Sequence, residues 1–183
     1  TIFADDAVKH SGNWSVRIER TASSPEKYTT ITKTVPVAFG GRRVELRGFV
    51  RSEEVSDFFA LWLREDGMEP SLAFASLENR HLKGTTGWTE YSVTVPLRPE
   101  ARKLVLGFIV AGSGRGWVDD LQLLVDGKPV WDVPVVEPVL TVLDRDHEFD
   151  VGSKVSLTAL SPVQRDNLFT LGRVWGFLKY HHP

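Results

Sequence analysis

Residues 84–123 constrain the fold of this chain more than any other stretch, because they contain three consecutive strand patterns separated by two turn signals. The first pattern, residues 91–97, alternates apolar and polar side chains and predicts a strand with one apolar face. The second, residues 103–111, is apolar on both faces, which is typical of a central strand covered on both sides. The third, residues 117–123, alternates again. This succession predicts the antiparallel sheet of a β-sandwich.

The third strand pattern also carries an acid that needs partners. Trp117, Leu121 and Leu123 share the parity predicted to face inward, and Asp119 has the same parity. An unpaired buried carboxylate is strongly disfavoured, so Asp119 is expected to accept loop backbone N–H groups or to pair with an arginine. The glycine-rich segment AGSGRGW, residues 111–117, leads into this strand and not into a helix, so it predicts a hairpin turn and not a phosphate loop.

In the first half of the chain, strand patterns recur at intervals of roughly ten residues. Turn signals separate them and no helical period is present, so the pattern favours a sandwich or a barrel. In the first of these patterns, Trp14, Val16 and Ile18 are predicted to face inward. The strand patterns cover residues 14–20, 28–37, 44–51, 58–65 and 72–77.

The residue pattern of the sequence changes after residue 125. Residues 134–160 contain two prolines and an acidic run, and they are interpreted as a connector with room for one or two extra strands. Ser161 is a suitable N-cap and Pro162 suits the first helical position, so a helix is predicted to follow. Its apolar stripe is wider than a solvated surface helix needs, so this helix is expected to pack on the sandwich or on a domain outside the sequence.

Composition excludes several functional classes. With 183 residues, 42% of them hydrophobic, the chain can bury a core without a disulfide or metal, and its net charge of -2 gives no electrostatic case for nucleic acid. No apolar run is long enough to span a membrane. The lack of cysteine excludes thiol catalysis and cysteine-based zinc sites. Because no Gly-x-Ser-x-Gly elbow or recognisable Ser–His or Ser–Lys pair is present, this chain is predicted not to be an enzyme.

Aromatic residues are the main candidates for ligand binding, since sugar rings stack on aromatic faces. Trp62, Trp88 and Tyr91, flanked by Arg64, are the residues proposed for such a platform. The alternative for each is a place in the core, which also applies to Trp117. Trp88 precedes its strand pattern and is predicted to be the most exposed.

Four segments of the chain resemble one known family: LWLREDG (61–67), GTTGWTEYSVTVPL (84–97), GFIVAGSGRGWVDDLQL (107–123) and NLFTLGRVWGFLKYHHP (167–183). They are similar to the N-terminal region of bacterial serine peptidases of the C-terminal-processing, tricorn-core-related family. There, a jelly-roll domain like a carbohydrate-binding module precedes the peptidase. The resemblance implies an all-β antiparallel jelly-roll sandwich over residues 1–133, a connector over 134–160, and a helix over 161–183 that opens the peptidase part.

The same resemblance implies a function. It indicates a non-catalytic accessory domain of an exported, extracytoplasmic serine peptidase, which positions substrate or attaches the enzyme to a surface. The family's nucleophilic serine and its basic partner are expected in a downstream peptidase domain, beyond residue 183. Two alternatives stay open: a module that binds a glycan or peptide through exposed aromatics, and a purely structural or oligomerising domain.

A calcium ion is the one cofactor that the resemblance suggests. Jelly-roll modules of this kind often hold structural Ca²⁺ between an acid near the last strand and oxygens of the N-terminal segment. In this sequence Asp119, Asp5 and Asp6 are the candidate ligands. Phe3 is followed by Ala4 where such modules commonly have glutamate, so one candidate ligand is missing.

Overall fold

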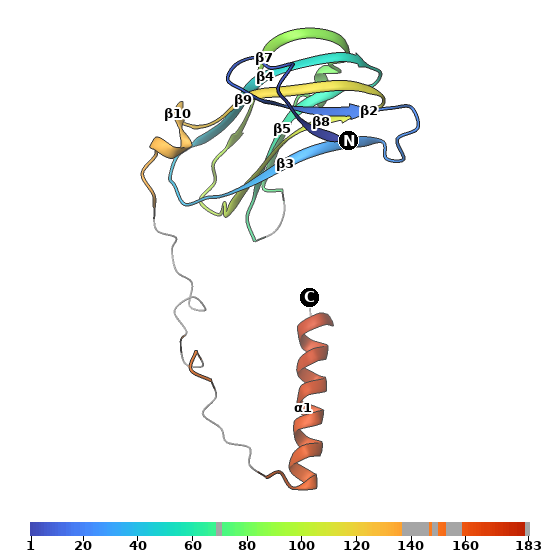
Figure 1. The fold of residues 1–183 in the computed structure, drawn as a ribbon. Helices are drawn as coiled ribbons and strands as arrows, with labels where there is room; N and C mark the ends of the chain where they lie inside the picture. The colour runs from blue at the N-terminus through green and yellow to red at the C-terminus, as the bar shows by residue number, and fades with distance from the viewer. Residues whose placement is uncertain (69–70, 137–146, 148–149, 153–158, 182–183) are drawn as a thin grey trace. The chain divides into compact units, whose positions relative to one another are not determined.

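A computed structural model of the chain describes residues 1–68, 71–136, 147, 150–152 and 159–181. The chain divides into two compact units, Thr1–Pro138 and Val139–Pro183. The first unit is built from strands and the second contains one helix (Figure 1). The elements are β1 (Ile2–Asp5), β2 (Ser15–Arg20), β3 (Tyr28–Pro36), β4 (Arg43–Val55), β5 (Phe59–Asp66), β6 (Ala73–Ser76), η1 (Glu78–Arg80), β7 (Gly84–Pro96), β8 (Lys103–Ala111), β9 (Gly114–Val125), β10 (Lys128–Pro129), η2 (Val130–Asp132) and α1 (Pro162–His181).

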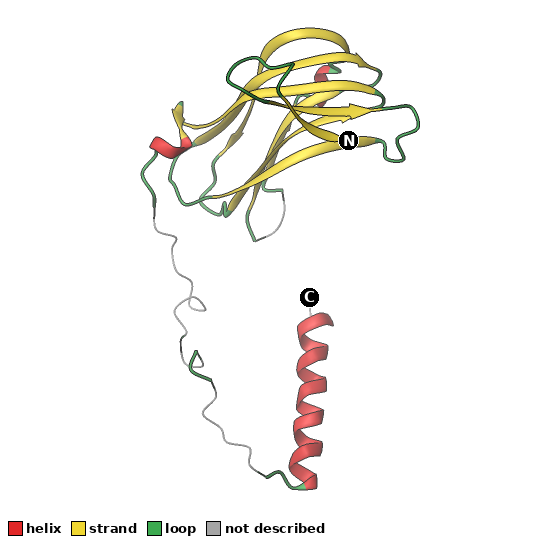
Figure 2. Ribbon diagram, viewed as in Figure 1, coloured by secondary structure: helices red, strands yellow, loops and turns green. Residues whose placement is uncertain are grey.

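The strands form two antiparallel sheets that face each other (Figure 2). Sheet A has the order β1-β2-β9-β4-β7, with β10 paired to β9, and sheet B has the order β3-β8-β5-β6. Most neighbouring strands, such as β2 and β9 or β3 and β8, come from distant parts of the sequence, as in the double Greek key of a jelly roll. The predicted all-β antiparallel jelly-roll sandwich is therefore confirmed.

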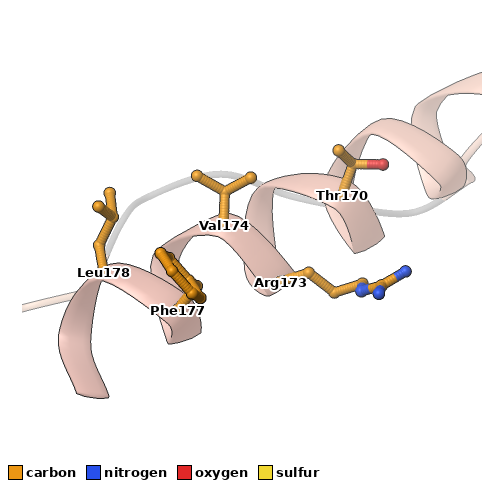
Figure 3. A pocket seen from close by; sticks show the side chains of 5 residues that line it. All are labelled: Thr170, Arg173, Val174, Phe177 and Leu178. Carbon is orange, nitrogen blue, oxygen red and sulfur yellow. The ribbon is translucent and has the colours of Figure 1, made fainter. Parts of the chain in front are cut away.

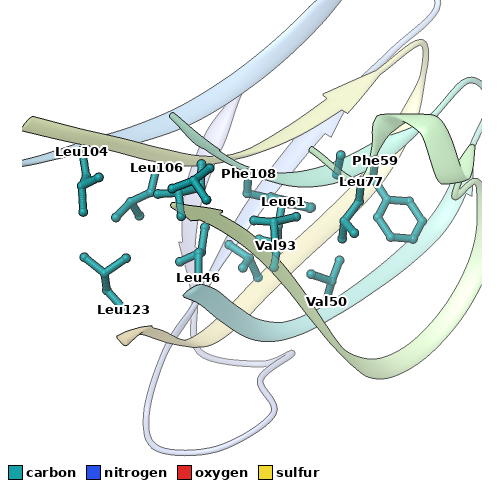
Figure 4. Close-up of a cluster of buried hydrophobic side chains, with 14 of the residues drawn as sticks. Leu46, Val50, Phe59, Leu61, Leu77, Val93, Leu104, Leu106, Phe108 and Leu123 are labelled. Atoms are coloured by element: carbon teal, nitrogen blue, oxygen red, sulfur yellow. The ribbon is translucent and has the colours of Figure 1, made fainter. Parts of the chain in front are cut away.

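The core lies between the two sheets. Because side chains alternate along a strand, β5 and β8 send one parity inward and leave the other on the outer face of sheet B. Figure 4 shows Leu104, Leu106 and Phe108 of β8 on one side of the core, with Leu46 and Leu123 of sheet A on the other. All five side chains are buried.

Two predictions about strand faces are wrong. Trp14 lies before β2 and is 58% exposed, because the turn through Gly12 ends only at Ser15, whose hydroxyl donates to the Val8 carbonyl oxygen. In β9, a bulge shifts the pairing with β4 around Asp120, which has a φ of 49°. An extra residue reverses the parity that follows.

The bulge separates side chains that the sequence pattern places on one face. Asp119 pairs with Phe49 on the outward parity of β4, whereas Leu123 pairs with Leu46 and points into the core. Leu121 is exposed. Trp117 is 1% exposed, as predicted, but its neighbours in the register are Arg17 and Arg51, and it is covered from the outer side of sheet A.

The second unit consists of α1 and the described residues before it. Ser161 caps the helix: its hydroxyl accepts the Gln164 N–H at 3.3 Å, and the Gln164 side chain accepts the Ser161 N–H at 2.9 Å. This reciprocal capping box confirms the predicted start. A hollow of ≈350 Å³ on α1 is lined by Thr170, Arg173, Val174, Phe177 and Leu178, whose side chains are drawn in Figure 3. The strands predicted within the connector fall largely outside the described residues.

No helix in the part of the chain that the structure describes is long and apolar enough to cross a membrane.

Candidate ligand-binding site

The outer face of sheet B carries a pair of aromatic side chains, one of them exposed and the other half-buried. Trp62 and Arg64 of β5 alternate with the buried Leu61 and Leu63, so both point outward. The register places Trp62 opposite Gly107 of β8 on one side and opposite Ser76 of β6 on the other. We call this surface the sheet B platform, and define it by Thr30, Trp62, Arg64, Phe74 and Gly107.

The indole of Trp62 lies along the surface of the sheet. A Cβ atom on Gly107 would sit 2.7 Å from Trp62 Cε2 and 2.8 Å from its Cζ2, so only glycine leaves room for the ring over β8. The Nε1–H then donates to Thr30 Oγ1 of β3 at 3.2 Å. The indole thus extends from β5 across β8 to β3 and is held at both ends, and the side chain is half-buried.

Phe74 of β6 adds a second aromatic ring beside Trp62. Phe74 pairs with Arg64, so it is diagonal to Trp62 in the register, a spacing at which aromatic side chains still touch. The two ring centroids are 6.3 Å apart with an interplanar angle of 41°. Phe74 is 56% exposed, which leaves its ring accessible from solvent.

A fixed guanidinium lies beside this aromatic pair. Arg64 donates from Nε to Asp66 Oδ1 at 2.8 Å and from Nη2 to Asp66 Oδ2 at 2.9 Å. Asp66 also accepts the backbone N–H of Ser71 at 2.8 Å. The hydrogen bonds from Arg64, ahead of the one from Ser71, lower the pKa of the Asp66 carboxyl, so the acid stays charged and keeps the guanidinium in place.

The other two predicted platform residues lie on sheet A. Tyr91 of β7 pairs with Gly48 and packs edge-on against the buried Phe59, with ring centroids 6.3 Å apart. Trp88, predicted to be the most exposed, falls within β7 and is half-buried, because this strand starts seven residues earlier than its sequence pattern. Its neighbour is the ring of His10, 5.8 Å away. The structure therefore brings together Trp62 and Arg64, but not all four residues.

The acids predicted to bind calcium organise the N-terminal loop. Asp119 Oδ2 accepts the backbone N–H groups of His10 at 2.8 Å and Ser11 at 3.1 Å. Asp120 holds the same loop, since it accepts the Ser11 hydroxyl at 2.6 Å and His10 Nδ1 at 2.7 Å. Those two contacts, the one from Ser11 first, lower the pKa of Asp120. The alternative role of Asp119, as an acceptor of loop N–H groups, matches this geometry.

Asp5 is similarly surrounded by donors. Its Oδ1 accepts the N–H groups of Ala7 and Val8, each at 3.0 Å. Its Oδ2 accepts Trp117 Nε1–H at 2.9 Å and Arg17 Nη1–H at 3.2 Å. These contacts, led by the bond from Trp117, lower the pKa of Asp5.

These acids do not fit a cation in the arrangement described. Donor hydrogens already point at the carboxylate oxygens of Asp5 and Asp119, and Asp6 is exposed. Within the described residues, no three His, Asp or Glu side chains are grouped so that they could hold a metal ion. Calcium binding thus stays a prediction, to be tested by chelation.

Sequence reasoning missed three platform residues. Phe74 lies in the short apolar run of residues 72–77, and its parity relative to Ala73 and Ala75 was the available signal. Thr30 and Gly107 had no such signal, because their proximity to Trp62 depends on the pairing of β3 and β5 with β8.

Comparison with known proteins supports the fold of this chain but does not identify a family. No protein-family model matches the chain. Over 80 residues the chain is 30% identical to an uncharacterized HTH-type transcriptional regulator, YbfP, of Bacillus subtilis (strain 168); the match covers 43% of this chain and 27% of the regulator. The chain thus spans about a quarter of that protein, and the likeness shows neither family nor activity.

Solved structures include similar sandwiches. The enzymatically active domain of tailspike protein 4 from bacteriophage CBA120 has a TM-score of 0.53 at 14% identity, over 68% of this chain and 18% of that one. A family 16 carbohydrate-binding module has a TM-score of 0.49 at 10% identity, over 67% of this chain and 84% of that one. At such identities the tailspike likeness shows the fold alone.

Proposed function

We propose that this chain is a non-catalytic glycan-binding module and that the sheet B platform is its binding surface. The observation that carries the proposal is the indole of Trp62, held flat over Gly107 with Phe74 beside it. The C–H face of a pyranose ring is apolar and stacks on such a ring, while its hydroxyl groups need polar neighbours at the edge. Thr30 and Arg64 supply these neighbours.

The rigidity of the platform favours binding. The hydrogen bond to Thr30 and the contact with Gly107 fix the Trp62 side chain before any ligand arrives. The bidentate contact with Asp66 does the same for Arg64. Side chains that are already ordered lose little conformational entropy when they bind, so more of the contact free energy becomes affinity.

The association with an exported serine peptidase stays a prediction. Neither the regulator nor the tailspike protein described above is named as a peptidase. A glycan-binding module is compatible with that setting, because an accessory domain that binds a surface polysaccharide attaches its enzyme there. The reading frame of the gene beyond residue 183 tests it: a long region with the family's serine and its basic partner is expected.

Calorimetry of the full chain tests the glycan proposal. The probes are the linear β-1,4-linked hexasaccharides of glucose, xylose, mannose and galactose. At least one is expected to bind, and W62A and F74A are each expected to weaken binding by about thirtyfold, the cost of losing an aromatic anchor of about 2 kcal/mol. The matched control W14A removes an exposed tryptophan away from sheet B and is expected to bind as the parent chain does.

Two results would overturn the proposal. One is the absence of saturable binding to any hexasaccharide. The other is a loss of binding in W88A that W62A does not reproduce, since Trp88 lies on sheet A.

A further inference from the structure

A pocket with charged and hydroxyl side chains in its lining lies beyond one end of the strands that carry the sheet B platform. Its volume is ≈480 Å³, within the range of small-ligand sites. Three connections form its walls: the β2–β3 loop, the β4–β5 turn and the β8–β9 turn. We call it the loop pocket; its lining residues are Arg20, Thr21, Ala22, Ser24, Pro25, Glu26, Lys27, Ser56, Asp57, Gly112 and Ser113.

Hydrogen bonds between the three connections fix the walls. Arg20 is 6% exposed and donates to Gly112 O at 2.7 Å and also to the carbonyl oxygen of Glu26, so it joins the β2–β3 loop to the β8–β9 turn. Ser113 donates its N–H to Ser56 Oγ at 2.8 Å, and the Ser56 N–H donates to Ser113 O at 2.9 Å. The pocket is therefore formed before any ligand binds.

The side chains of the pocket suit a ligand rich in hydroxyl groups. Asp57 and Lys27 are exposed, and within the described residues neither side chain has a hydrogen bond or ion pair. A carboxylate accepts from two adjacent hydroxyls and an ammonium group donates to a third, and such charge-assisted bonds are the stronger ones. Ser24 and Thr21 add hydroxyl groups, and the lining contains no aromatic side chain on which a ring could stack.

The loop pocket lies beside the first residue of β3, the strand that contributes Thr30 to the sheet B platform. Lys27 lines the pocket, and Tyr28, 54% exposed, is the next residue and pairs with Ala111 of β8. Two residues further, Thr30 has the same parity and accepts the Trp62 indole N–H. At the strand rise of about 3.3 Å per residue, Thr30 and Lys27 are about 10 Å apart, a distance that two sugar residues span.

We infer that the loop pocket binds the terminal residue of the glycan whose inner residues stack on Trp62, so that the module recognises the end of a polysaccharide chain. This inference rests on the proposed function. The platform supplies stacking for internal sugars, whereas the pocket supplies the charged groups that select a terminal residue with its additional free hydroxyl.

The number of modules bound per glycan chain tests the inference. The probes are the best-binding hexasaccharide from the calorimetric panel and a soluble linear polysaccharide of the same sugar and linkage with known number-average length. One module per chain is expected for both. D57N and K27M are each expected to weaken binding by about tenfold, the value of one charge-assisted hydrogen bond. The control E54Q changes an exposed carboxylate outside the loop pocket and is expected to bind normally.

The outcomes separate this inference from the proposed function. Several modules per polysaccharide chain, in proportion to its length, with binding still lost in W62A, would overturn end recognition and leave the platform in place. Unchanged affinity in both D57N and K27M would overturn it as well. Absence of binding to every glycan would remove the proposed function and this inference with it.

Discussion

Replacing Asp5 with asparagine is expected to destabilise the sandwich by about 3 kcal/mol, because one carboxylate serves four donors there. Asparagine keeps one acceptor oxygen and turns the other into an NH₂ donor. Either the loop N–H groups of Ala7 and Val8 or the pair Trp117 and Arg17 then lose their acceptor. Trp117 is 1% exposed, so water cannot replace the lost partner, and an unpaired buried donor costs about 1–3 kcal/mol.

Urea unfolding followed by tryptophan fluorescence measures this loss, with D6N as the matched control. Asp6 is exposed, and within the described residues its carboxylate has no partner, so D6N is expected to change stability by less than about 0.5 kcal/mol. In a thermal scan, D5N is expected to lower Tm by about 10 °C. Equal effects of D5N and D6N would refute the assignment of Asp5 as the acid that holds the N-terminal loop.

The effect of D5N also depends on pH in a definite direction. The contacts led by Trp117 lower the folded-state pKa of Asp5, so its charged form is stabilised in the folded protein. That stabilisation is complete above the unfolded carboxyl pKa of about 3.9 and is lost as the pH falls through the lower folded-state pKa. The difference in unfolding free energy between the parent chain and D5N is therefore expected to shrink below pH about 4.

Three further changes test other contacts. In G107A the new Cβ would lie 2.5 Å from Ile31 O and 2.7 Å from Trp62 Cε2. The free energy of unfolding in urea is therefore expected to fall by about 2 kcal/mol, and glycan binding is expected to weaken. An unchanged glycan affinity would contradict the role of the sheet B platform. R20M removes the hydrogen bonds from Arg20 to the carbonyl oxygens of Gly112 and Glu26 and is expected to lower the free energy of unfolding by about 3 kcal/mol in the same assay. An unchanged free energy of unfolding would show that these loops do not depend on Arg20. Millimolar calcium followed by EDTA is expected to leave Tm unchanged, whereas a Tm that rises with calcium concentration would establish the predicted metal site.

Alternation of side chains predicted most of the strands, because period-two burial is a local property of the sequence. The strand over residues 103–111 coincides with β8. β1 was missed, since its first three residues are exposed and no apolar alternation distinguishes them. The bulge at Asp120 could not be predicted either, because one inserted residue reverses which side chains face the core and leaves no local pattern in the sequence.

The binding face depends on pairing between distant strands, which the sequence does not reveal. β5 is apolar on both parities, so nothing local shows that Trp62 faces outward while Leu61 and Leu63 face the core. The space for the indole comes from Gly107, more than forty residues later and adjacent only through the register of β5 and β8. Trp62 and Arg64 could therefore each be proposed from the sequence, but the fold does not place them beside Trp88 and Tyr91.

The most direct test of the sheet B platform is an NMR titration that follows the indole N–H signals of the six tryptophans as the best-binding hexasaccharide is added. The Trp62 signal is expected to shift in a saturable way, because its N–H is bonded to Thr30 within the proposed site. The signals of Trp14 and Trp117 are expected to stay in place. A saturable shift of Trp88 with none at Trp62 would contradict the account, since it would put the glycan on sheet A.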